Sequence, residues 1–126
     1  MNIREKKIFI ADDDQDILEI ISMILHTKNY EIQATSDAND IFNLNDSDLP
    51  DLILMDIWMS GLDGREICRC LKNDDHTKDI PFIFISANSN IEEITKEYKA
   101  DGYIAMPFEM QELLSKINSY LVEAAV

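Results

Sequence analysis

Residues 52–56, Leu52-Ile53-Leu54-Met55-Asp56, decide the fold of this chain. Four consecutive apolar residues followed by an acid are typical of a central parallel strand, covered on both faces and ending in a polar rim. Comparable apolar runs recur, each followed by residues suited to phosphate or metal chemistry or, in the last case, by a methionine: Ile8–Ala11 before Asp12-Asp13-Asp14, Phe82–Ile85 before Ser86, and Tyr103–Ala105 before Met106. If these runs are parallel strands, their carboxyl ends meet at one edge, where open α/β sheets bind ligands.

The segments between the runs carry apolar residues at helical spacing. Isoleucines recur at that spacing from Ile17 to Ile24, and Asp14 is placed to cap this helix, which we expect to end near Lys28. Asn90 and Glu93 form a capping-box pattern before a helix through Tyr98. Three further helices are expected: a short one around residues 41–44 after Asp37, one with Ile67, Cys70 and Leu71 facing inward, and one from about Glu109 with Leu113, Ile117, Tyr120 and Leu121 facing inward.

One strand differs from the others. Tyr30 to Thr35 alternates apolar and polar residues, as an edge strand with one wetter face would. Five alternating strand–helix units predict a parallel sheet with helices on both faces. Right-handed crossovers and this edge strand favour a doubly wound, flavodoxin-like (βα)5 fold with strand order 2-1-3-4-5. We expect residues 1–126 to form a single domain, either stand-alone or excised from a longer protein.

The charge balance excludes several classes of partner. The 126 residues include 25 acidic and 11 basic side chains, a formal net charge of −14. Direct nucleic-acid binding needs clustered Lys and Arg and is not expected. No segment has the apolar core of a signal peptide or the length of a membrane span, so a cytoplasmic protein without a membrane partner is expected. A solvated acidic surface explains most of the charge.

Cysteine and histidine offer no metal or redox centre. Cys68 and Cys70 are too few for a disulfide framework, and a C-x-C pair on a helix directs its thiols to different faces. We interpret both as helix-packing residues. His26 and His76 have no second ligand at suitable spacing and are expected on the surface.

The acids at the rim point to a cation. In the predicted order Asp12 and Asp13 lie beside Asp56, and two carboxylates about 5 Å apart repel by roughly 3 kcal/mol at an effective dielectric near 20. Such a cluster either raises a pKa or holds a metal ion. Ligands that are all oxygen favour Mg²⁺, Mn²⁺ or Ca²⁺, and Mg²⁺ suits a site that shares its shell with a phosphoryl group.

Simpler explanations exist for each acid alone. Asp13 and Asp14 could serve only as charges at a helix N-terminus, and Asp56 could be a turn-forming residue after a strand. As a nucleophile, Asp56 could instead attack phosphorus and form an acyl phosphate. Ser86, at the end of the next strand, could then bond a phosphoryl oxygen.

Four stretches together resemble the receiver domain of response regulators in bacterial two-component signalling: IFIADDDQDI (residues 8–17), DLILMDIWMSGLDG (51–64), PFIFISA (81–87) and ADGYIAMPF (100–108). The resemblance covers nearly the whole chain. It implies that a histidine kinase or a histidine phosphotransfer protein donates a phosphoryl group to the chain. It also implies a downstream protein target, bound at the face of the last strand and last two helices.

The resemblance also implies roles for single residues. Asp56 matches the phosphoacceptor, Asp13 a direct Mg²⁺ ligand, and Asp12 an acid that acts mainly through water. The remaining matches are the backbone carbonyl of Trp58 as a metal ligand, the Ser86 hydroxyl as a phosphoryl contact, and Tyr103 as the aromatic switch residue. The chain would not be a conventional enzyme; at most it would phosphorylate itself from a phosphodonor and dephosphorylate itself.

Met106 departs from the family pattern, which has Lys-Pro after the last strand. That lysine meets the phosphoryl oxygens, and losing a charge-assisted hydrogen bond of about 1.5–3 kcal/mol would weaken the phosphorylated state roughly ten- to a hundred-fold. The family's habit also predicts a cis Met106–Pro107 bond.

Other functions remain open at this point. The alternative that Met106 favours is a protein-interaction module of the same fold that signals without phosphorylation. A flavin electron carrier would need a phosphate loop where three aspartates stand. A phosphatase of the haloacid dehalogenase type would need a second acid at the position of Trp58.

Overall fold

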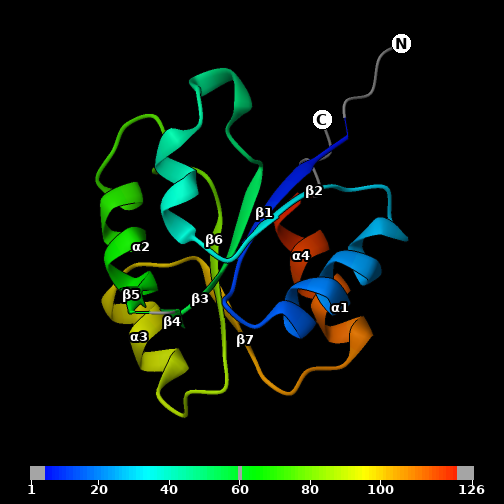
Figure 1. The fold of residues 1–126 in the computed structure, drawn as a ribbon. Helices are drawn as coiled ribbons and strands as arrows, with labels where there is room; N and C mark the ends of the chain where they lie inside the picture. The colour runs from blue at the N-terminus through cyan, green and yellow to red at the C-terminus, as the bar shows by residue number, and fades with distance from the viewer. Residues whose placement is uncertain (1–4, 60, 122–126) are drawn as a thin grey trace.

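Five parallel strands form the central sheet in the order β2-β1-β3-β6-β7 (Figure 1). The computed structural model describes residues 5–59 and 61–121. The sheet strands are β1 (Lys7–Ala11), β2 (Glu31–Thr35), β3 (Leu52–Asp56), β6 (Phe82–Ser86) and β7 (Gly102–Ala105). Counted along the chain these five strands have the order 2-1-3-4-5, so the predicted flavodoxin-like topology is confirmed.

Helices cover both faces of the sheet. One face carries α1 (Gln15–His26) and α4 (Met110–Leu121), and the opposite face carries α2 (Gly64–Lys72) and α3 (Ile91–Glu97) (Figure 1). Two 3-10 helices, η1 (Ala38–Asn43) and η2 (Asp46–Asp48), follow β2, and an antiparallel hairpin of β4 (Trp58–Met59) and β5 (Leu62–Asp63) follows β3. No helix of the described residues is long and apolar enough to cross a bilayer.

Two hydrophobic cores explain the unbroken apolar runs. In β3, Leu52 and Leu54 pack with α1 and α4, whereas Ile53 and Met55 pack with α2 and α3. Successive side chains of a strand point to opposite faces, so a strand with a core on each face needs an apolar residue at every position. The same division holds for β1.

Two local predictions are wrong, and a third is met by a different type of helix. Ile67 and Leu71 are buried as expected, but Cys70 is exposed and Cys68 is the fully buried cysteine of α2. The Asn90 side chain makes no cap bond to α3; the backbone N–H of Asn90 donates to Asn88 Oδ1 instead, at 2.8 Å. The expected helix around residues 41–44 is the 3-10 helix η1, where Asn and Asp side chains compete with helical backbone bonding.

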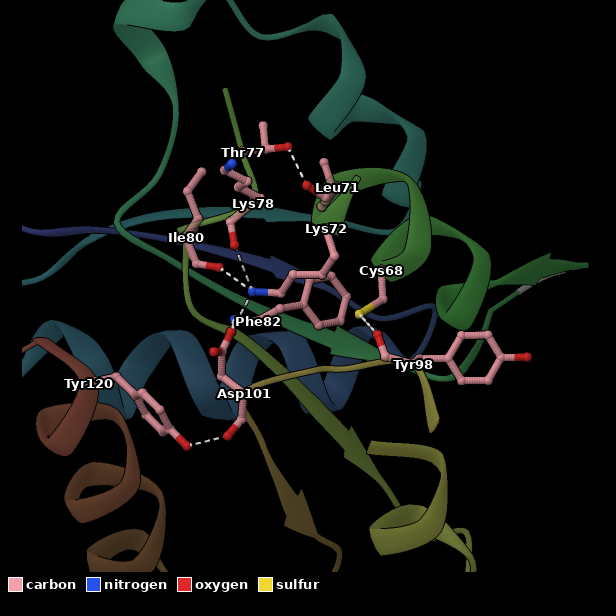
Figure 2. A network of polar contacts seen from close by, with 10 residues as sticks. All are labelled: Cys68, Leu71, Lys72, Thr77, Lys78, Ile80, Phe82, Tyr98, Asp101 and Tyr120. Atoms are coloured by element: carbon pink, nitrogen blue, oxygen red, sulfur yellow. Dashed lines mark hydrogen bonds and ion pairs between the residues drawn. The ribbon is translucent and has the colours of Figure 1, made fainter. Parts of the chain in front are cut away.

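A polar network ties the amino-terminal edge of the sheet together, far from the carboxyl ends of the strands (Figure 2). Lys72 Nζ donates to the carbonyl oxygens of Lys78 and Ile80, both at 3.1 Å, and to Asp101 Oδ2 at 2.6 Å. Asp101 Oδ2 also accepts the Phe82 N–H at 2.8 Å. Because Phe82 begins β6, this network fixes the start of a central strand.

Tyr120 of α4 joins the same network (Figure 2). Its hydroxyl donates to the carbonyl oxygen of Asp101 at 2.6 Å. A Cβ atom at Gly102 would lie 2.6 Å from that hydroxyl oxygen, so the lack of a side chain there is what admits the tyrosine.

Candidate functional site

The acids predicted to form a cluster lie together at the carboxyl ends of β1 and β3. Ala11 pairs with Met55 across these two strands, so the residues that follow, Asp12 and Asp56, are neighbours. Carboxylate oxygens of Asp12, Asp13 and Asp56 lie within 4.8 Å of one another. The expectation drawn from strand order therefore holds in three dimensions.

The three consecutive aspartates after β1 occupy different environments. Asp12 is 3% exposed and its Oδ1 accepts the Asp14 N–H at 2.9 Å. Asp13 is exposed and turns toward the cluster. Asp14 caps α1, since its Oδ1 accepts the N–H of Asp16 at 2.9 Å. The helix-charge explanation thus accounts for Asp14 but not for the other two.

Crowding and burial make this cluster reluctant to carry its full negative charge. Burial is the main cause that raises the pKa of Asp56 to about 7, and the charge of Asp12 adds to it. The pKa of Asp12 is also raised, mainly by burial, against the opposing hydrogen bond from the Asp14 backbone. A divalent cation would relieve both effects, because it stabilises the charged form of each carboxylate.

The donor set fits Mg²⁺. All three side chains supply carboxylate oxygens, and no His or Cys joins the cluster among the described residues. Hard oxygen ligands of this kind select Mg²⁺ or a similar ion, and one or two carboxylates together with waters and phosphate oxygens are its usual shell.

The acids line one side of a cavity of about 290 Å³. Its walls are formed by Asp12, Asp13, Asp14, Ile17, Asp56, Ser86, Ala87, Asn88 and Met106. Four of these residues are acids, and no Lys or Arg of the described residues lines the cavity. The structure therefore brings together five residues singled out in the sequence: Asp12, Asp13, Asp56, Ser86 and Met106.

Ser86 and Met106 come from the neighbouring strands β6 and β7. The Met106 N–H donates to the Ser86 carbonyl oxygen at 2.9 Å, which joins the two strand ends. Ser86 Oγ accepts the Asn88 N–H at 3.0 Å, so the hydroxyl proton remains available to a ligand in the cavity. The Met106–Pro107 bond is cis, as expected.

Two of the singled-out side chains lie outside the cavity. Trp58 is 55% exposed on β4 and does not line the cavity. Tyr103 is half-buried on β7, with Lys116 Nζ 5.7 Å from its ring centroid. Ile17 and Asn88 also line the cavity, although the sequence did not mark either as a site residue. The position of Asn88, two residues after Ser86, is the sequence feature that could have placed it there.

Comparisons with known proteins agree with this geometry. The family model described as "Response regulator receiver domain" matches residues 8–118. The nisin biosynthesis regulatory protein NisR of Lactococcus lactis subsp. lactis is 36% identical over 115 residues, which are 90% of this chain and 49% of that protein. The chain therefore spans about half the length of that relative.

Solved structures share the fold. A crystal structure of a putative response regulator from Chloroflexus aurantiacus superposes with a TM-score of 0.86 at 27% identity, covering 94% of this chain and 98% of that one. The receiver domain of a sensor histidine kinase from Pseudomonas aeruginosa, solved with magnesium coordinated in its active-site cleft, superposes with a TM-score of 0.82 at 22% identity. That match covers 93% of this chain and 98% of the other and concerns the fold alone.

Proposed function

The chain belongs to the response regulator receiver domain family, and from this premise we propose that Asp56 accepts a phosphoryl group and that the domain relays the change to a protein target. The observation that carries the proposal is the position of Asp56. It ends a buried central strand, beside two more acids, and opens into a cavity large enough for a phosphoryl group. The domain is proposed to span residues 1–126.

The proposed donor is a phosphohistidine on a histidine kinase or a histidine phosphotransfer protein. One Asp56 carboxylate oxygen attacks phosphorus, a P–O bond forms as the P–N bond breaks, and the imidazole leaves with the electron pair. Attack needs the ionised carboxylate. The raised pKa of Asp56, about 7, leaves it only partly ionised near neutral pH, and a nearby positive charge would favour the ionised form.

Asp12, Asp13, Asp56 and the backbone carbonyl of Trp58 are the proposed Mg²⁺ ligands. When bound, Mg²⁺ would supply positive charge to the transferring phosphoryl oxygens. Ser86 is proposed to donate its hydroxyl proton to one of those oxygens, which its hydrogen bond from Asn88 leaves free to do. Tyr103 is the proposed switch residue that passes the change to the surface of α3, β7 and α4.

A second function is favoured by one observation. Met106 lines the cavity at the sequence position of the family's lysine, and the described cavity walls hold no cationic side chain. A domain that binds its target without phosphorylation would need no such cation. The two functions differ in whether Asp56 is ever modified.

Intact-mass spectrometry after incubation with phosphoramidate and Mg²⁺ tests the choice. We expect the wild type to gain the mass of one phosphoryl group. We expect no gain in Asp56→Asn, and none in the wild type when excess EDTA is present during the incubation. An unmodified wild-type chain, with a known receiver domain labelled in parallel, would contradict phosphoacceptance and favour the phosphorylation-independent module.

A further inference from the structure

Two aromatic rings and two guanidinium groups alternate on the face built by β4, α2 and α3. The guanidinium carbon of Arg65 lies 5.0 Å from the Trp58 ring centroid and 5.8 Å from the Tyr98 ring centroid. The guanidinium carbon of Arg69 lies 5.1 Å from the Tyr98 ring. Each distance is within the range of cation–π attraction, which is about 6 Å. Arg65 is the member that connects the hairpin after β3 to α3.

The Arg65 guanidinium also forms a salt bridge with Asp63. The Asp63 carboxylate accepts Arg65 Nε at 3.0 Å and Nη2 at 2.9 Å, a two-point contact that fixes the plane of the guanidinium. The same carboxylate caps α2 by accepting the Arg65 N–H at 2.9 Å. Asp63 is also the partner of Trp58 across the two-stranded sheet. Arg65 therefore contacts both side chains of one cross-strand pair.

The backbone of Trp58 is restrained by the pairing of β4 with β5 and by the turn into α2. Strand β4 has two residues, and Trp58 is more than half exposed. The end of the hairpin is joined to the residue that follows β3, because the Gly64 N–H donates to the Ile57 carbonyl oxygen at 2.6 Å. A Cβ atom at Gly64 would overlap the carbonyl oxygen of Asp56. This close approach sets the backbone on one side of Trp58, and Arg65 sets it on the other.

We propose that Arg65 is a positioning residue for the metal site, which fixes the backbone carbonyl of Trp58 by stacking on its ring and bonding Asp63. The inference rests on the proposed function, since it takes that carbonyl to be a Mg²⁺ ligand. Arg65 itself touches no proposed ligand atom. Residues that orient metal ligands change metal affinity about 10- to 100-fold when they are replaced.

The chain offers a matched control four residues away. Arg69 is on the same helix, carries the same charge and stacks on the same Tyr98 ring, whereas the guanidinium stacked on Trp58 among the described residues is that of Arg65. Mg²⁺ affinity is measured by isothermal titration calorimetry for the wild type, Arg65→Ala, Arg65→Lys and Arg69→Ala. Acrylamide quenching of Trp58, the chain's only tryptophan, reports how firmly its ring is held without metal.

We expect Arg65→Ala to weaken Mg²⁺ binding about tenfold and to raise the quenching of Trp58. Arg69→Ala is expected to leave both unchanged. Arg65→Lys keeps the cation but loses the two-point contact with Asp63, so its affinity should lie between those of the wild type and Arg65→Ala.

Three results would overturn the inference. Equal affinities in Arg65→Ala and the wild type would show that the carbonyl needs no help from Arg65. An equal loss of Mg²⁺ affinity in Arg65→Ala and Arg69→Ala would show that the effect comes from the positive charge of this face and not from the contact of Arg65 with Trp58. No Mg²⁺ binding in the wild type would remove the proposed metal site itself, an outcome distinct from the other two.

Discussion

Lys72 Nζ and Asp101 Oδ2 lie 2.6 Å apart, and their contact joins the end of α2 to the start of β7 across 29 positions of sequence. The ammonium group is nearly buried, with 13% of the side chain exposed, and all three of its protons have acceptors. The carboxylate in turn holds the first backbone N–H of β6 (Figure 2). This pair orders the edge of the sheet opposite the candidate site.

Replacing Lys72 with Met should lower the free energy of unfolding by about 1.5–3 kcal/mol, the range for hydrogen bonds to charged groups. Methionine keeps the apolar stem but removes the donor to the Lys78 and Ile80 carbonyl oxygens, and it leaves the Asp101 carboxylate with the Phe82 N–H but without its cation. Urea unfolding followed by circular dichroism measures the change. Lys96→Met is the control, because Lys96 is 78% exposed in an i,i+4 pair with Glu92 and should cost less than about 0.5 kcal/mol. Equal stability of the Lys72 and Lys96 variants would show that the network adds nothing.

Stability without Mg²⁺ should fall as the pH rises, because of Asp56. Burial and the charge of Asp12 raise its pKa from 3.8 to about 7 in the folded protein, so the folded state holds a proton that the unfolded chain releases. The free energy of unfolding therefore decreases as the pH rises from about 4 to about 7. Above the folded pKa of Asp56 its contribution falls no further.

Asp56→Asn removes this titration, so it should be more stable than the wild type at pH 8 in EDTA and closer to it at pH 5. Urea unfolding of both proteins at the two pH values gives the difference directly. A constant difference between them would mean that Asp56 titrates at its ordinary value.

Met106→Lys should increase the yield or the lifetime of phosphorylated Asp56 about ten- to a hundred-fold, the equivalent of a charge-assisted hydrogen bond of about 1.5–3 kcal/mol. The reason is that the described cavity walls carry acids and a hydroxyl but no cation. Acyl-phosphate formation and decay are followed under one phosphodonor. Met106→Gln, with a side chain of similar length and no charge, is the control. If the lysine variant behaves as the glutamine variant does, another cation already serves the phosphoryl group.

The two thiols should react at very different rates. Burial raises the pKa of the Cys68 thiol to about 12, and its Sγ contacts the Tyr98 carbonyl oxygen at 3.5 Å, whereas Cys70 is exposed. A thiolate-directed reagent such as iodoacetamide should therefore label one cysteine in the folded protein and two in urea. Peptide mapping identifies the site, and rapid labelling of Cys68 in native buffer would contradict the burial described for α2.

The sheet and most of the candidate site were predictable because both follow from local sequence. A strand with a core on each face is apolar at every position, so residues 52–55 are recognisable without knowledge of their partners. Parallel strands end at one edge, and this brings Asp12, Asp56 and Ser86 together from segments far apart in the chain.

Features that depend on contacts between distant segments were not predictable. Cys70 was placed on the inner face of α2 in error: Cys68 and Cys70 are equally apolar, and it is Cys68 that is buried, with its Sγ against the Tyr98 carbonyl oxygen. The stacking of Arg65 between Trp58 and Tyr98 has no periodic signal, since the three residues come from three different elements. The backbone N–H of Asn90 donates to Asn88 Oδ1, a loop bond that the capping pattern does not encode.

The close approach of Tyr120 to Gly102 has a consequence for how this family varies. Any side chain at position 102 would displace the hydroxyl that now bonds the Asp101 carbonyl. Evolution can enlarge residue 102 without strain only if residue 120 becomes smaller or turns away. The two positions should therefore covary among relatives, with a tyrosine at 120 accompanying glycine at 102 and a shorter residue accompanying any larger one.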